Sequence, residues 1–147
     1  MTTATNRPRV PIKPGFFTVP EDASQAPQFL CTRCENCGEH FFPRREICAK
    51  CLSEKTAQIE LAGRGTLYSY TFVHIPLFGS TNIEHVEGYG VGLVDLPEGP
   101  RLQMPLFGKQ GDFSIGQAMQ AELDKLREDD NGRDVVIVRF RAVEAGR

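Results

Sequence analysis

Apolar and polar residues alternate through the second half of the chain with the period of two that is typical of β-strands. In AMQAELDKL, Met119, Ala121 and Leu123 share one face of an extended chain, and polar residues occupy the other. VVIVRFRAV, near the C-terminus, repeats this alternation. Because the Asn131-Gly132 pair between them is a typical tight-turn sequence, we predict that the two segments form a β-hairpin.

TLYSYTFVHI and GYGVGLV predict further strands. We expect both faces of the first to be covered, with Tyr68, Tyr70 and Phe72 on one face and Leu67, Val73 and Ile75 on the other. In the second, Gly90 and Gly92 leave one face bare, which permits close approach to the backbone or sharp coiling. Gly63 and Gly65 in LAGRGT are expected to form a bulge that opens the first strand.

Helical periodicity is scarce, and twisted strands with glycines at their bends indicate a mainly β fold. We predict that residues 59–147 form an OB-fold β-barrel, a small and partly open five-stranded barrel. No apolar run approaches the roughly 20 residues that span a bilayer, and the N-terminus has no apolar core of a secretory signal. We therefore expect a cytoplasmic protein without a membrane partner.

Residues 1–30 differ in composition from the rest of the chain. Five of the ten prolines fall here, and PRVPIKPG favours extended, polyproline-like backbone without a hydrogen-bond ladder of its own. We interpret this segment as an N-terminal arm. It is either a disordered leader or an arm that lies on a partner, anchored by Ile12, Phe16, Phe17 and Val19.

Residues 31–58 form a cysteine module. CTRCENCGEHFFPRREICAKC contains two C-x2-C pairs separated by ten residues, Cys34 with Cys37 and Cys48 with Cys51. A tetrahedral Zn²⁺ ion takes four thiolates at about 2.3 Å, and each C-x2-C turn presents two of them. We predict a rubredoxin-like zinc ribbon with a structural Zn²⁺, although this spacing does not separate zinc from iron.

A fifth cysteine, Cys31, lies three residues before Cys34 and offers a competing first pair. We prefer Cys34 with Cys37 because Gly38 follows, and such turns require a positive φ just after the second ligand. Cys31 is then a free or buried thiol. A catalytic zinc would keep an open position with three protein ligands. Candidates for such a ligand set include His40, His74 and His85, but we favour the closed four-thiolate site.

The charge distribution bears on possible partners. Residues 1–59 carry 8 basic and 6 acidic side chains, a net charge of +2, and residues 60–147 carry 9 basic and 13 acidic ones, a net charge of −4. Nucleic-acid binding relies on neutralising phosphates with lysine and arginine, so a nucleic-acid partner is not expected. Four basic side chains near the cysteines offset the −2 charge of Zn²⁺ with four thiolates: Arg33, Arg44, Arg45 and Lys50.

The order of these segments resembles one known family. CENCGEHFFPRREICAKC, AGRGTLYSYTFVH and GYGVGLVDLPEGPRL are similar to the zinc-ribbon and OB-fold proteins associated with acyl-CoA enzymes. One departure is Leu52, where the second knuckle often has glycine. The resemblance implies a non-catalytic accessory subunit that forms a hetero-oligomer with a thiolase-fold large subunit, which acts on CoA thioesters by thiolysis or acyl transfer.

The resemblance also implies where such a subunit makes contacts. Any contact with the phosphates of a CoA thioester would come from Arg44, Arg45 or Arg101. The candidate interface anchors, for which ordinary core packing is the competing interpretation, are Phe16, Phe17, Phe41, Phe42 and Arg44.

Two other functions compete with this one. OB barrels also bind single-stranded nucleic acid by stacking bases on aromatic side chains, and Tyr68, Tyr70 and Tyr89 could serve this purpose. The thiolate site could also belong to an independent metalloenzyme or redox protein. The G-x-S-x-G, P-loop and H-E-x-x-H signatures are absent from the sequence, so we rank the accessory subunit first, the nucleic-acid binder second and the metalloenzyme third.

Overall fold

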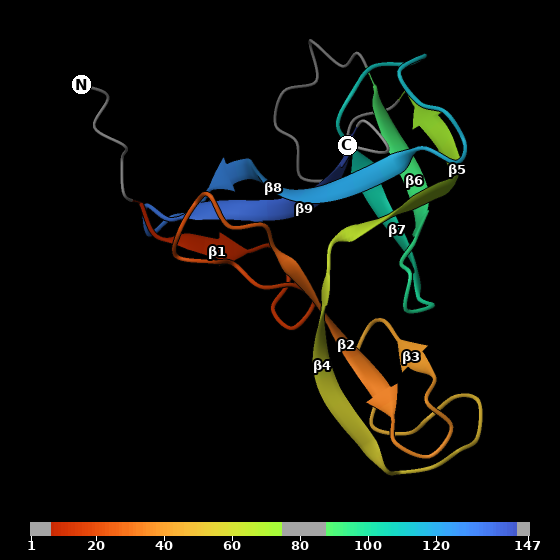
Figure 1. Cartoon of the computed structure of the whole chain (residues 1–147). Coiled ribbons are helices and arrows are strands. Elements are labelled where there is room, and N and C mark those ends of the chain that lie inside the picture. The colour runs from red at the N-terminus through yellow and green to blue at the C-terminus, as the bar shows by residue number, and fades with distance from the viewer. Residues whose placement is uncertain (1–6, 75–87, 144–147) are drawn as a thin grey trace.

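A computed structural model of the chain describes residues 7–74 and 88–143 (Figure 1). Within these ranges the secondary structure consists of nine strands: β1 (Arg9–Pro11), β2 (Gln28–Cys34), β3 (His40–Phe41), β4 (Thr56–Ala62), β5 (Arg64–Val73), β6 (Tyr89–Asp95), β7 (Arg101–Leu106), β8 (Ala118–Glu128) and β9 (Asp134–Ala142). The same ranges contain no helix long and apolar enough to cross a bilayer.

Five of the strands close into a barrel. Their order is β9-β7-β6-β5-β8, and β8 pairs with β9 to complete the circle. The β8–β9 hairpin turns at Asn131-Gly132, where Gly132 has a φ of 75°. Met119 and Ala121, which β8 directs inward, are 1% and 0% exposed. The predicted OB-type barrel and its C-terminal hairpin are therefore confirmed.

The bare face of β6 accommodates large side chains of the barrel interior. A Cβ atom placed on Gly92 would lie 2.8 Å from Cδ1 of Leu67 and 2.9 Å from Cδ2 of Leu106. A Cβ atom on Gly90 would lie 2.9 Å from the ring of Phe113. The close approach expected at these glycines is confirmed, because neighbouring side chains use the space that a β-carbon would occupy.

The predicted pattern of β5 is wrong at one point. A bulge lies between Leu67 and Ser69, and its extra residue shifts the two-residue alternation. Tyr70 consequently pairs with Gly92 and shares the inner face with Leu67, instead of lying opposite to it. Tyr68 and Tyr70 are 50% and 39% exposed, so the strand is not covered on both faces. Ile75, which we placed in this pattern, lies outside the described residues.

The bulge predicted at Gly63 and Gly65 is wrong, because the register shift of β5 lies at Leu67/Ser69, and the two glycines serve close packing instead. A Cβ atom on Gly65 would lie 2.4 Å from the carbonyl oxygen of Asp95, and one on Gly63 would lie 2.4 Å from Cβ of Ala121. Gly63 stands between β4 and β5, where the chain passes from the smaller sheet into the barrel (Figure 1). A side chain at either glycine would force neighbouring strands apart.

The N-terminal arm lies on this chain's own barrel. β1 pairs in parallel with β9, so both the disordered leader and the arm without a hydrogen-bond ladder are wrong for the described residues. Phe17 is 7% exposed and bridges to Phe29, whereas Ile12 is 49% exposed. Anchoring of Phe17 on a partner is therefore also wrong. Pro11 ends the pairing with β9, and an edge strand tolerates proline because one side of its backbone needs no ladder.

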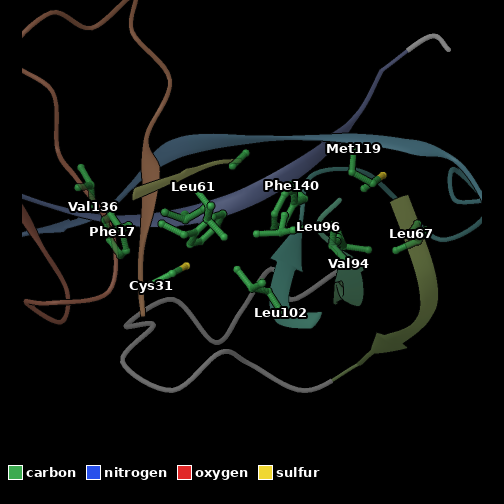
Figure 2. Close-up of a cluster of buried hydrophobic side chains, with 14 of the residues drawn as sticks. Phe17, Cys31, Leu61, Leu67, Val94, Leu96, Leu102, Met119, Val136 and Phe140 are labelled. Carbon is green, nitrogen blue, oxygen red and sulfur yellow. The ribbon is translucent and has the colours of Figure 1, made fainter. Parts of the chain in front are cut away.

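The smaller sheet has the order β3-β2-β4. β2 and β4 pair along their whole length, from Cys34 with Thr56 to Gln28 with Ala62. The sheet shares one hydrophobic core with the barrel: Cys31 and Leu61 of the smaller sheet belong to the same buried cluster as Phe140 (Figure 2). Packing therefore joins the two sheets into one unit.

Candidate metal centre

The first cysteine knuckle follows directly from the end of β2. Cys34 is the last residue of β2, and the amide of Gly38 donates a hydrogen bond of 3.0 Å to the carbonyl of Cys34. The turn requires a left-handed residue after its second cysteine, and Gly38 has a φ of 78°. The backbone thus returns to β3 with the side chains of Cys34 and Cys37 on the same side.

The second knuckle repeats this geometry in the connection between β3 and β4. The amide of Leu52 donates a 3.0 Å hydrogen bond to the carbonyl of Cys48, as Gly38 does to Cys34. Leu52 has a φ of 64°, a region that a leucine rarely adopts. Its side chain is 75% exposed, so most of it lies in solvent. The second knuckle therefore forms without glycine.

The sulfur atoms of four cysteines converge at the tip of the ribbon. Those of Cys34, Cys37, Cys48 and Cys51 all lie within 4.8 Å of one another. Cys34 and Cys51 are 3.6 Å apart, as are Cys37 and Cys48. A tetrahedron of zinc–sulfur bonds near 2.3 Å has edges of about 3.8 Å, so the four sulfurs fit a zinc ion. They fill every corner of that tetrahedron.

Hydrogen bonds to the sulfurs of Cys48 and Cys51 favour the thiolate form that a metal requires. The amide of Cys37 donates to the sulfur of Cys34 at 3.4 Å, and the amide of Lys50 donates to that of Cys48 at 3.3 Å. The side chain of Asn36 donates to the sulfur of Cys51, which lowers the pKa of this thiol to about 6. We did not single out Asn36 from the sequence, although its place inside the first knuckle was a signal.

Cys31 and the histidines lie elsewhere. Cys31 is 0% exposed on β2, and burial raises the pKa of its thiol to about 11. His40 stands on β3, and the ring of His74 is 5.2 Å from the ring of Phe72. None of these side chains belongs to the cysteine cluster. His85 lies outside the described residues.

The three candidate arginines lie in two different places. Arg44 and Arg45 belong to the connection between β3 and β4, and Arg101 begins β7 in the barrel. Nε of Arg44 is buried and has no hydrogen-bond partner among the described residues, whereas the side chain of Arg45 is exposed. Arg101 donates to both oxygens of Asp95, at 2.6 and 3.1 Å, and covers the ring of Tyr68 at 3.5 Å.

The remaining proposed anchors, all phenylalanines, divide between core and surface. Phe42 packs edge-on against both Phe16 and Phe29, with ring centres 5.7 and 5.5 Å apart. Phe41 lies on β3, and the guanidinium carbon of Arg45 is 5.9 Å from the centre of the Phe41 ring. Phe16 and Phe42 therefore pack against this chain's own core, and Phe41 is the one phenylalanine of this group that lies outside it.

The pairing of Asp95 with Arg101 leads to a titration prediction. Hydrogen bonds from Arg101 lower the pKa of Asp95 below its usual value, so the small stabilisation that the pair supplies is present above that usual value. The stabilisation is lost as the pH falls through the pKa of the folded state. We expect Arg101→Gln to raise the pKa of Asp95 in a carboxyl NMR titration. An unchanged pKa would contradict the pairing.

A cysteine-knuckle ribbon followed by a five-stranded barrel defines a zinc-ribbon and OB-fold protein. Residues 22–57 match the model of the ChsH2 rubredoxin-like zinc ribbon domain, and residues 58–124 match that of the ChsH2 C-terminal OB-fold domain. The chain belongs to the DUF35 family, which combines these two domains. The family resemblance stated from the sequence is thereby confirmed.

Relatives cover most of the chain. A DUF35 domain-containing scaffold protein of Methanocaldococcus jannaschii is 34% identical over 117 residues, 76% of this chain and 79% of the relative. The benzoylsuccinyl-CoA thiolase subunit BbsA of Thauera aromatica is 28% identical over 130 residues, 88% of this chain and 86% of the relative. The solved Ltp2-ChsH2(DUF35) aldolase superposes with a TM-score of 0.58 at 30% identity, covering 78% of this chain and 84% of that chain.

Proposed function

We propose that this chain is a non-catalytic, zinc-binding subunit of a thiolase-fold enzyme complex that acts on CoA thioesters. The observation that carries the proposal is the closed set of four sulfurs, because a zinc ion held by four thiolates has no open position for substrate. The zinc then stabilises the ribbon, and the large subunit supplies the catalytic residues. The same role is supported by relatives that are named as a thiolase subunit and as scaffold proteins.

The tip of the ribbon offers a surface for the large subunit. Ile47 and Leu52, which flank the second knuckle, are 50% and 75% exposed although both are large and apolar. Exposed apolar side chains on a rigid, metal-held turn can dock on a partner without losing much conformational freedom. We propose that this tip contributes to assembly of the hetero-oligomer.

A CoA thioester bound in the complex would meet a cation of this subunit. Arg45 is exposed beside the ribbon tip, and Nε of Arg44 still has a proton to donate. Arg101 is the weakest candidate of the three, because Asp95 already accepts two of its hydrogen bonds and neutralises its charge. The same pairing disfavours the nucleic-acid alternative, in which Tyr68 would need a free face and a nearby positive charge.

Co-expression tests the proposed role. We expect the purified chain alone to show no thiolysis or acyl transfer, and to form a stoichiometric complex with a thiolase-fold protein encoded beside it. Leu52→Asn keeps a residue that tolerates positive φ but removes the apolar contact, and it should weaken the complex. Ile115→Asn, at an equally exposed position of the barrel, is the matched control. Failure to co-purify with any such protein would contradict the proposal.

A further inference from the structure

β4 is an edge strand that the described residues leave unprotected. Proteins usually protect sheet edges by short strands, prolines, lysines or bulges. β1 is three residues long and ends at Pro11, and β3 is two residues long with Pro43 close behind it. β4 is seven residues long, TAQIELA, with no proline, lysine or bulge. Among the described residues, no strand pairs with its outer edge (Figure 1).

The pairing of β2 shows which backbone groups of β4 point outward. On β2, the carbonyl of Gln28 and the amide of Leu30 bond to residues 16–18, on the side away from β4. The alternate residues of β2 therefore supply the hydrogen bonds to β4, and Cys31, one of these, stands opposite Ile59. Ile59 thus directs its amide and carbonyl inward, to β2.

Gln58 and Glu60, on either side of Ile59, then direct their amides and carbonyls away from β2. Their side chains are exposed, and no described segment covers them. The two residues present four unpaired backbone groups in a straight row. Such a row matches another antiparallel strand in the same hydrogen-bonding phase.

We propose that β4 pairs with β4 of a second copy of this chain, antiparallel and about a two-fold axis at Ile59. In this register Gln58 of each copy lies opposite Glu60 of the other, and Thr56 of each copy lies opposite Ala62 of the other. Every residue of β4 has a partner, and the amide of each glutamine can donate to the carboxylate opposite. The two isoleucines meet at the axis, where cross-strand β-branched pairs are favourable.

The neighbouring registers are less favourable for a physical reason. The hydrogen-bonding phase requires the axis to pass through a residue and not between two residues, so the nearest alternatives to Ile59 are Gln58 and Glu60. An axis at Glu60 places two carboxylates directly opposite, which is destabilising. An axis at Gln58 pairs only five of the seven residues. The register at Ile59 therefore has the best charge complementarity and the most hydrogen bonds, and it produces a six-stranded sheet across two ribbons.

A charge series at one position tests this register in the zinc-loaded full chain. Gln58→Glu places a second carboxylate opposite Glu60 of the other copy, at both symmetry-related positions. We expect it to raise the dissociation constant of the dimer about tenfold, as measured by sedimentation equilibrium. Gln58→Lys places opposite charges there and should strengthen the dimer by a similar factor. The double variant Gln58→Glu with Glu60→Lys should restore it. All three changes are at exposed side chains, so zinc content and β-sheet circular dichroism serve as controls of folding.

The outcomes are distinct from those that test the proposed function. The dimer is measured without any partner protein, so a failure of the chain to co-purify with a thiolase-fold protein would not affect this result. A chain that stays monomeric at millimolar concentration overturns the proposal. A dimer whose dissociation constant does not change across the charge series as predicted also overturns it, because its interface then lies elsewhere. If Gln58→Glu weakens binding of the large subunit while the chain is monomeric, the edge belongs to that subunit and self-pairing is wrong.

Discussion

Removal of the metal is expected to unfold the ribbon of this chain. Structural zinc contributes roughly 10–16 kcal/mol in small modules, which is as large as the roughly 5–15 kcal/mol net stability of a whole domain. Cys34 and Cys48 are 0% exposed, and their sulfurs lie within 4.8 Å of those of Cys37 and Cys51. Without the metal, no bond holds these four sulfurs together. In a chelator titration followed by amide hydrogen exchange, β2, β3 and the knuckles should lose protection together.

Substitution of one cluster cysteine should have the same effect as chelation, and the fifth cysteine supplies a matched control. We expect Cys48→Ser to lose the metal and the protection of the ribbon. Cys31→Ala removes an equally buried thiol outside the cluster, so it should keep one zinc per chain and cost only about 1–2 kcal/mol of unfolding free energy. Elemental analysis measures the zinc. A protected ribbon in the metal-free chain, or loss of zinc from Cys31→Ala, would contradict the assignment.

The features that were predictable from the sequence are those that short segments determine. Two cysteines in C-x2-C followed by Gly38 specify a knuckle within five residues, and Asn131-Gly132 marks the short connection in which β8 turns into β9. The alternation of Met119 and Ala121 with polar residues then identifies the buried face of β8. No knowledge of distant parts of the chain is needed for these steps.

The features that were not predictable depend on pairing between distant segments. The bulge between Leu67 and Ser69 exists because β5 must pair with β6 and, at its first residues, with β8. The arm forms β1 because β9, more than a hundred residues later, offers a free edge at Val135 and Val136. Proline spacing describes the backbone of the arm, but it contains no information about that edge.

The same distinction applies to the candidate arginines. Asp95 and Arg101 are six residues apart, and only the β6–β7 register places them directly opposite. That pairing reduces the availability of Arg101 for an external phosphate, an effect that a count of charges along the chain does not contain. Arg44 differs because its loop folds onto the core next to Phe42, which leaves Nε buried without an acceptor among the described residues.

The barrel and the ribbon share one core, so a single side chain couples them. Phe29 of β2 is 0% exposed, stacks on Phe140 of β9 with ring centres 5.7 Å apart, and meets Phe42 edge-on at 5.5 Å. It therefore joins a strand that ends in a cysteine knuckle to a strand that closes the barrel. A ribbon that docks on a large subunit can position the barrel only if this packing holds the two parts in a fixed orientation.

Phe29→Ala is expected to lower the free energy of unfolding by about 3–5 kcal/mol, because it removes a fully buried ring and leaves a cavity between the sheets. Phe41→Ala, at a phenylalanine of the same ribbon that lies outside the core, should cost less than about 1 kcal/mol. Urea denaturation of both variants and of Phe140→Ala gives these values. In the double variant, the Phe29–Phe140 stack should appear as a coupling of about 0.5–1.5 kcal/mol. Equal losses for Phe29→Ala and Phe41→Ala, or zero coupling, would contradict the role of Phe29 in joining the ribbon to the barrel.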